Sequence, residues 1–178
     1  MSHLSRALIL TLAFVPGSTL FAQENRVRVL SPRDSATQTI GAAEVSVNYG
    51  RPSKRGREIF GGLVPHGVVW RTGANQATHF RTDHDLTVGT LRVPPGTYTL
   101  WTIPEKDSWT LIVNRATGQW GTDYDKTQDL GRIPMKVVTL REPVEQFTIA
   151  LAPSGGASGV LTMTWDTTQA SVPIRAEK

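Results

Sequence analysis

The residues best suited to chemistry lie in one short stretch that combines a guanidinium, an amide and a hydroxyl. Arg71, Asn75 and Thr78 are close together in sequence, and Gly73 and Ala74 between them favour a tight bend of the backbone. Arginine presents a rigid fork of donors that matches the oxygens of a carboxylate or phosphate. This stretch is therefore a candidate anion-binding site.

Two further arginines, Arg51 and Arg57, precede the stretch, and either one completes an anion pocket if it folds over beside Arg71. A structural interpretation competes with this one. In it, Arg71 pairs with a buried carboxylate such as Asp123 or Asp125, and the amide of the bend satisfies backbone groups. The candidate ligand-binding residues are Arg51, Arg57, Arg71, Asn75 and Thr78.

Positive charge is concentrated in the same region. Residues 49–82 contain six lysines and arginines and one acidic residue, a net charge of +5, whereas the whole 178-residue chain has a net charge of +4. The excess positive charge is therefore local. It predicts that residues 51–78 bind a small anionic or polar ligand.

Metal-dependent and hydrolytic chemistry have weaker support. His79 and His84 lie near Asp83 and Asp85, but on a continuous strand the two histidines face opposite sides unless the chain turns at Asp83. The chain has no cysteine, no HExxH and no GxSxG motif. We expect no cofactor and assign no metal ligand, and a hydrolase, metal-assisted or not, remains an alternative function.

The tryptophans favour core packing over sugar binding, with one exception. Most of the five lie in alternating segments, where burial is the rule. Trp120 lies instead in the loop Gly118–Gly121 and is predicted to be exposed. Together with the basic segment, Trp120 supports a second alternative, a module that binds carbohydrate or protein of the cell envelope.

The elements that must position these residues are strands. Short alternating segments are separated by many of the 16 glycines and 11 prolines, and residues 44–49 place Val45, Val47 and Tyr49 on one face. The pattern predicts an all-β antiparallel β-sandwich, jelly-roll-like or a flattened barrel, with little helix and about nine or ten strands.

Several local predictions accompany this fold. Residues 86–93 are predicted to form one strand with a bulge at Gly89, because the apolar positions change phase there. The turn 94–96 should join that strand to a central strand at 97–103 as a hairpin, with 83–85 forming the tip of the preceding hairpin. Residues 154–159 are predicted to form a hairpin tip.

The first 22 residues are typical of a secretory signal peptide. Arg6 precedes the apolar run Ala7–Val15, Pro16 breaks it, and a small residue, Ala22, suits cleavage before Gln23. The run is far shorter than the about 20 residues that span a membrane. We therefore expect a periplasmic or secreted protein that does not span the membrane and does not bind nucleic acid. After the signal peptide 1–22, residues 23–38 are predicted to form a flexible N-terminal arm and residues 39–178 a single β-sandwich domain.

One run of residues resembles a known family. Residues 70–78 read WRTGANQAT and residues 95–100 read PGTYTL, and Trp109, Asn114 and Trp120 follow in order. From about Ser31 to Ile174 the chain resembles the domain-of-unknown-function 2911 family. The resemblance implies an exported bacterial protein rich in β-structure. Because the family has no assigned activity, the resemblance transfers no catalytic residue.

Overall fold

The computed structural model describes residues 30–177, and over this range the chain forms an all-β antiparallel fold of nine strands. The strands are β1 (Arg33–Ile40), β2 (Ala43–Gly50), β3 (Thr78–Thr82), β4 (Leu86–Val88), β5 (Leu91–Val93), β6 (Gly96–Pro104), β7 (Trp109–Asn114), β8 (Asp129–Gly155) and β9 (Ser158–Ala176). The described helical structure is a single 3-10 turn, η1 (Lys126–Gln128). The predicted fold class and number of strands are confirmed.

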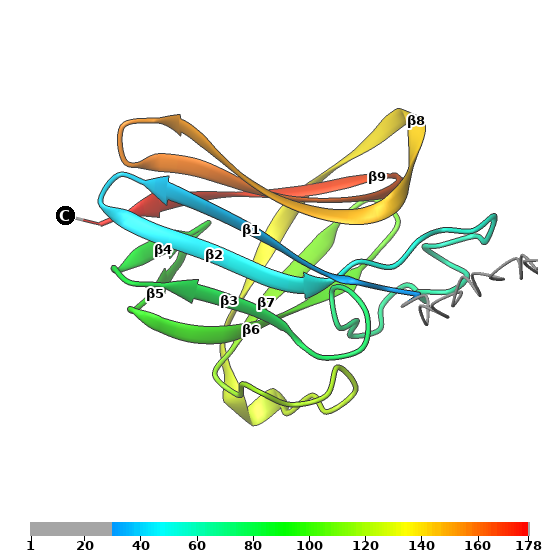
Figure 1. Ribbon diagram of the computed structural model, residues 1–178, viewed down its shortest axis with the longest axis horizontal. Helices are drawn as coiled ribbons and strands as arrows, with labels where there is room; N and C mark the ends of the chain where they lie inside the picture. Colours follow the sequence, from blue (N-terminus) through cyan, green and yellow to red (C-terminus); the bar gives the residue numbers. More distant parts are fainter. Residues whose placement is uncertain (1–29, 178) are drawn as a thin grey trace, which may run out of the picture.

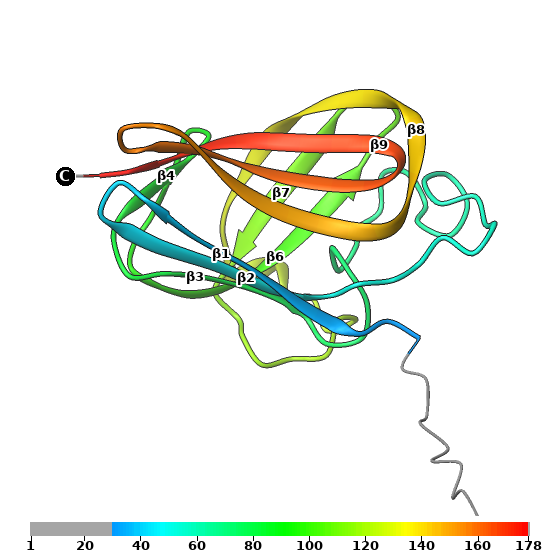
Figure 2. The same ribbon diagram turned by 45° about the horizontal axis from the view of Figure 1, so that its top comes forward.

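The strands are hydrogen-bonded in the order β1-β2-β3-β6-β7-β8-β9-β4-β5, with β1 and β5 at the two edges, so the sheet is not closed into a barrel. The long strand β8 connects the two layers, because residues 129–135 pair with β7 and the part from Lys136 onward pairs with β9. The hairpin of β8 and β9 lies as a second layer over β6 and β7 (Figures 1 and 2). This arrangement is consistent with a flattened β-sandwich.

Alternating apolar residues produce the core. In β2, Val45, Val47 and Tyr49 are at most 1% exposed, as their spacing predicts. The central strand β6 is buried on both faces: Leu100 belongs to the main core and Trp101 points the other way. The predicted strand at 97–103 and the hairpin tip at 154–159 are both confirmed.

Residues 86–93 do not form one bulged strand, and that prediction is wrong. They form the hairpin β4–β5, in which Val88 pairs with Leu91 and Gly89 turns the chain at a φ of +59°. A glycine at positive φ is equally compatible with a bulge and with a tight turn, so the local pattern did not distinguish them. The turns at 83–85 and 94–96 also join strands that do not pair, since β4 pairs with β9 and β6 pairs with β3 and β7.

The predicted arm at 23–38 needs a partial correction. Residues 33–38 belong to β1, which pairs with β2 from Arg33 opposite Gly50 to Ile40 opposite Ala43. β1 is an edge strand whose side chains are mostly polar and whose only buried residue is Ile40, so it lacks the apolar alternation that identifies a strand. The predicted signal peptide and residues 23–29 lie outside the described residues. Among those described, no helix has the length and apolarity needed to cross a membrane.

The connection from β2 to β3, residues 51–77, contains most of the candidate site. Figure 1 shows it at the end of the sandwich opposite the C-terminus.

Candidate functional site

The second half of the 51–77 connection is fastened to the central strand β6. Trp70 and Thr102 exchange two backbone hydrogen bonds, with N···O distances of 2.7 and 3.0 Å. The hydroxyl of Thr72 donates to the hydroxyl of Thr102 at 3.1 Å, and the buried hydroxyl of Thr78 donates to the carbonyl of Thr72 at 2.7 Å. These contacts hold the residues around Arg71 in place on the sheet.

An aromatic cluster fastens the first half. The ring of Phe60 lies 5.9 Å from Trp70, 4.8 Å from Trp109 and 6.2 Å from Trp165, measured between centroids, and its contacts are edge-to-face. The rings of Trp70 and Trp165 are nearly parallel, 17° apart, at 5.9 Å. Such pairs add to the stability that burial alone provides. The cluster therefore brings a β9 residue and a loop residue to one place.

The bend predicted at Gly73 and Ala74 is present. Thr72, Gly73 and Asn75 have φ values of +51°, +149° and +64°. Positive φ is common for glycine, tolerated by asparagine and rare for a β-branched threonine. Thr72 is therefore held in an unfavourable conformation by its surroundings, as is frequent at functional sites.

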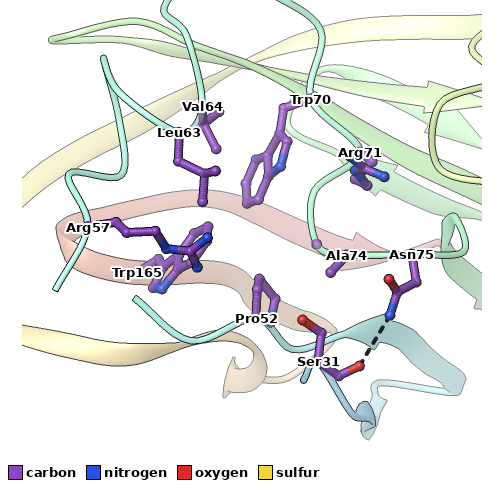
Figure 3. Close-up of a pocket in the computed structure, with 11 residues that line it drawn as sticks. Ser31, Pro52, Arg57, Leu63, Val64, Trp70, Arg71, Ala74, Asn75 and Trp165 are labelled. Atoms are coloured by element: carbon purple, nitrogen blue, oxygen red, sulfur yellow. Dashed lines mark hydrogen bonds between the residues drawn. The ribbon is translucent and has the colours of Figure 1, made fainter. Parts of the chain in front are cut away.

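A hollow of about 240 Å³ opens beside this bend. It is lined by Ser31, Pro52, Arg57, Leu63, Val64, Trp70, Arg71, Gly73, Ala74, Asn75 and Trp165. In the view of Figure 3, Arg57 and Arg71 lie on opposite sides of the hollow, with the indole of Trp70 between them. Three of the five predicted ligand-binding residues, Arg57, Arg71 and Asn75, thus line one hollow.

Arg71 has no protein partner in the described part of the chain. Within residues 30–177 its side chain makes no ion pair and no hydrogen bond, although it is half-buried. The carboxylates that the structural interpretation offered are engaged elsewhere. Asp125 accepts from the backbone N–H and hydroxyl of Thr127, and Asp123 accepts from the hydroxyl of Thr122. Arg71 thus lines the hollow without a hydrogen-bonding partner among residues 30–177.

Arg57 is only partly available. Its Nε donates to the carbonyl of Lys54 at 3.0 Å and one terminal nitrogen donates to the carbonyl of Ser53 at 2.7 Å. These bonds close a turn in the loop, and Lys54 itself pairs with Asp166 of β9 at 2.5 Å. Arg57 thus fixes the loop and brings positive charge to the hollow, whereas the guanidinium of Arg71 makes no such bond within the described residues.

Asn75 sits at the rim of the hollow. Its side-chain amide donates weakly to the carbonyl of Ser31 at 3.5 Å (Figure 3). Its backbone carbonyl accepts from the N–H of Gly121 at 2.9 Å, which ties the bend to the loop after β7. The amide of Asn75 is thus held only weakly by the protein and lies in the lining of the same hollow as Arg71.

The other two predicted residues do not line the hollow. Arg51 pairs with Asp34 of β1 at 3.3 Å and donates to the carbonyl of Phe147 and the hydroxyl of Thr148, both on β8. Thr78 is fully buried and bonds to Thr72. Arg51 therefore links β1 to β8, and Thr78 links β3 to the bend at Thr72.

Sequence reasoning missed the aromatic and apolar wall. Trp70 lies inside the family-like run, but both it and Trp165 were predicted only to pack in the core. Leu63 and Val64 come from a loop without periodicity, so no pattern identified them. The β8–β9 layer places Trp165 beside the loop, and this contact depends on the tertiary fold.

The histidines and aspartates near residue 80 do not form a metal-binding arrangement. His79 lies in β3, where the backbone N–H of Gly118 donates to its Nε2 at 3.4 Å, and burial lowers its pKa. Asp83 and His84 pair with each other at 2.8 Å, and the hydrogen bond from His84 lowers the pKa of the Asp83 carboxyl. No group of three potential metal ligands converges within residues 30–177.

Trp120 is 50% exposed, as its loop position predicts. Its backbone pairs with that of Gln76 in an isolated bridge, so this loop packs beside the bend that carries Arg71. The exposed indole is therefore a neighbour of the candidate site along the same surface.

Comparison with known proteins yields one match. The family model described as Protein of unknown function (DUF2911) matches residues 31–174 of the 178-residue chain. No curated protein and no solved structure matches.

Proposed function

The chain belongs to the family described as Protein of unknown function (DUF2911), and we propose that this member binds a small ligand with a carboxylate or phosphate group in the hollow beside Arg71. The observation that carries the proposal is the uncommitted guanidinium of Arg71 in the wall of a hollow. An arginine without a protein partner is free to form bidentate hydrogen bonds with an oxyanion. The predicted signal peptide places this function in the periplasm or outside the cell.

The surroundings of Arg71 suit an anion with a flat or apolar body. Arg57 adds a second positive charge on the opposite side, and the amide of Asn75 offers another donor at the rim. Trp70 provides a ring face between the two arginines. Half-burial of Arg71 excludes part of the water that would otherwise weaken the charge interaction.

The proposal is tested by titrating the purified chain, lacking residues 1–22, with inorganic phosphate and with acetate, using calorimetry or intrinsic tryptophan fluorescence. Hydrogen bonds to a charged group contribute about 1.5–3 kcal/mol, so Arg71→Met should weaken anion binding about 10- to 150-fold. Because Arg71 has no partner in residues 30–177, we expect this substitution to change the free energy of unfolding by less than about 0.5 kcal/mol.

Arg81→Met is the matched control. Arg81 lies on β3, its side chain is exposed, and it does not line the hollow. The substitution therefore removes the same charge outside the candidate site. It should leave anion binding within about twofold of the wild type, since surface pairs contribute little. Equal weakening by both substitutions, no anion binding by the wild type, or unfolding of the Arg71→Met protein would each refute the proposal.

Trp120 supports a second candidate, an envelope-carbohydrate module. A half-exposed indole beside a basic segment is suited to stacking on a sugar ring. Co-sedimentation of the chain with purified peptidoglycan tests it. Trp120→Ala should reduce the bound fraction several-fold while Arg71→Met leaves it unchanged, and a protein that stays in the supernatant even at low salt would exclude this function.

A further inference from the structure

A second hollow of about 280 Å³ adjoins the first. Leu63, Val64, Trp70 and Arg71 line both hollows, so the two adjoin along these residues. Ligand pockets in proteins usually occupy about 300–1,000 Å³. Each hollow alone is smaller than this range, whereas the two together fall within it.

The second hollow is more apolar than the first. Besides the shared residues, its walls include Pro65, Val68, Val69 and the buried ring of Trp101. The hydroxyl of Tyr124, whose ring lies 5.1 Å from that of Trp101, is turned to Asp129 at 2.8 Å, so its polar end is already satisfied. Arg71 is the one charged side chain in this lining.

Exposed apolar side chains gather around the two hollows. Five large apolar residues are exposed among the described residues: Leu30, Leu63, Val68, Trp120 and Val138. Leu63 is 47% and Val68 52% exposed, and both line the second hollow. Leu30 and Trp120 are neighbours in sequence of the lining residues Ser31 and Gly121, but their side chains do not line either hollow. Clustered exposed apolar side chains at a concave surface mark a place that an apolar partner covers.

We propose that the ligand is amphipathic, with its carboxylate or phosphate bound by Arg71 and an apolar chain lying over Leu63 and Val68 in the second hollow. This inference rests on the proposed function, because it assigns the rest of the molecule whose anionic group binds Arg71. Arg71 is at the boundary between the hollows and is therefore the residue from which a ligand can enter both. The chemical class is an alkyl carboxylate or alkyl phosphate.

A homologous series of linear carboxylates, from acetate through butanoate and hexanoate to octanoate, tests the inference. Burying one methylene group contributes about 0.8 kcal/mol, which corresponds to an increase in affinity of about fourfold. Because the hollow is open to solvent, we expect about two- to fourfold per methylene. Alkyl phosphates measured in parallel identify which head group is preferred.

Val68→Gln should abolish the dependence on chain length while leaving acetate binding intact, since it places a neutral polar group in the apolar hollow, adds no charge beside Arg71 and does not line the first hollow. Val138→Gln is the matched control, because Val138 is also exposed but lines neither hollow. Arg71→Met should weaken every member of the series by a similar factor.

The outcomes separate this inference from the proposed function. If all carboxylates bind through Arg71 with equal affinity, the proposed function stands and the amphipathic ligand is refuted. The same conclusion follows if affinity rises with chain length but Val68→Gln has no effect. If no anion binds, the proposed function fails first. If Val68→Gln instead converts a dimer into a monomer in sedimentation analysis, the apolar surface is an interface between copies of the chain, and the inference is overturned.

Discussion

Gly50 at the end of β2 is the described glycine at which an added Cβ atom would lie nearest to other backbone atoms. A Cβ atom at this position would lie 2.0 Å from the carbonyl oxygen of Ala74 and 2.9 Å from its carbon. Contacts below 3.0 Å are essentially absent for real Cβ atoms, and the obstacle is backbone, which cannot rotate away. Gly50→Ala must therefore push the bend at residues 72–75 away from β2 by about an ångström or more.

The cost of that shift can be worked out from what holds the two segments. Overpacking in a well-packed region costs about 1–3 kcal/mol. Moving the bend also weakens the hydrogen bond from Thr78 to Thr72 and the one from Thr72 to Thr102, each contributing about 0.5–1.5 kcal/mol. Alanine recovers about 0.5–1 kcal/mol because it has less backbone freedom to lose than glycine. We expect a net loss of about 3 kcal/mol, or about 6–12 °C in Tm for a domain of this size.

Urea and thermal unfolding, followed by tryptophan fluorescence and circular dichroism, measure this loss. Gly118→Ala is the control: its Cβ would meet nothing within 4 Å, but its φ is +81°. That substitution should cost only the backbone strain of about 1–2 kcal/mol. Because Arg71 and Asn75 flank the displaced bend, Gly50→Ala should also weaken phosphate binding. A Gly50→Ala protein as stable as Gly118→Ala would show that β2 and the bend are not in contact, and the reasoning would be refuted.

Three further predictions concern charge and titration. Arg51→Met should lower the free energy of unfolding, measured in urea, by about 1–3 kcal/mol, because it removes the ion pair to Asp34 and the hydrogen bonds to β8. Phosphate binding should stay unchanged. Weakened phosphate binding would show instead that Arg51 belongs to the ligand site. Burial lowers the pKa of His79, so as the pH falls the unfolded chain binds a proton at this histidine before the folded chain does. The free energy of unfolding should therefore fall as the pH drops below about 6.5. His79→Gln should weaken this pH dependence, measured as the urea concentration at the unfolding midpoint. Burial and the hydrogen bonds to Asp129 raise the pKa of Tyr124 to about 12. Tyr124→Phe should therefore remove the step at the highest pH when phenolate absorbance is titrated. Loss of a step at lower pH would contradict this prediction.

The sequence established the strands wherever one face is apolar and the other polar. Val45, Val47 and Tyr49 of β2 read as a strand because a period of two is the signature of a half-buried pleat. β1 failed this test because an edge strand can have polar side chains and still pair along its backbone. The β4–β5 hairpin was predicted as one bulged strand, because a glycine at positive φ is compatible with a bulge and with a turn.

The site divides in the same way. The sequence by itself determined which residues are capable of holding an anion, since a guanidinium fork, an amide and a glycine bend are properties of residue type and local spacing. Only the tertiary structure decided which arginine is available. Arg51 is paired because β1 and the distant strand β8 both contact its side chain. Asp123 and Asp125 instead accept hydrogen bonds from neighbouring threonines, so neither pairs with Arg71. Trp165 reached the same hollow because the β8–β9 layer folds across the loop. Long-range packing determines which residues contact a charged or aromatic side chain, and the local sequence pattern around that side chain does not predict them.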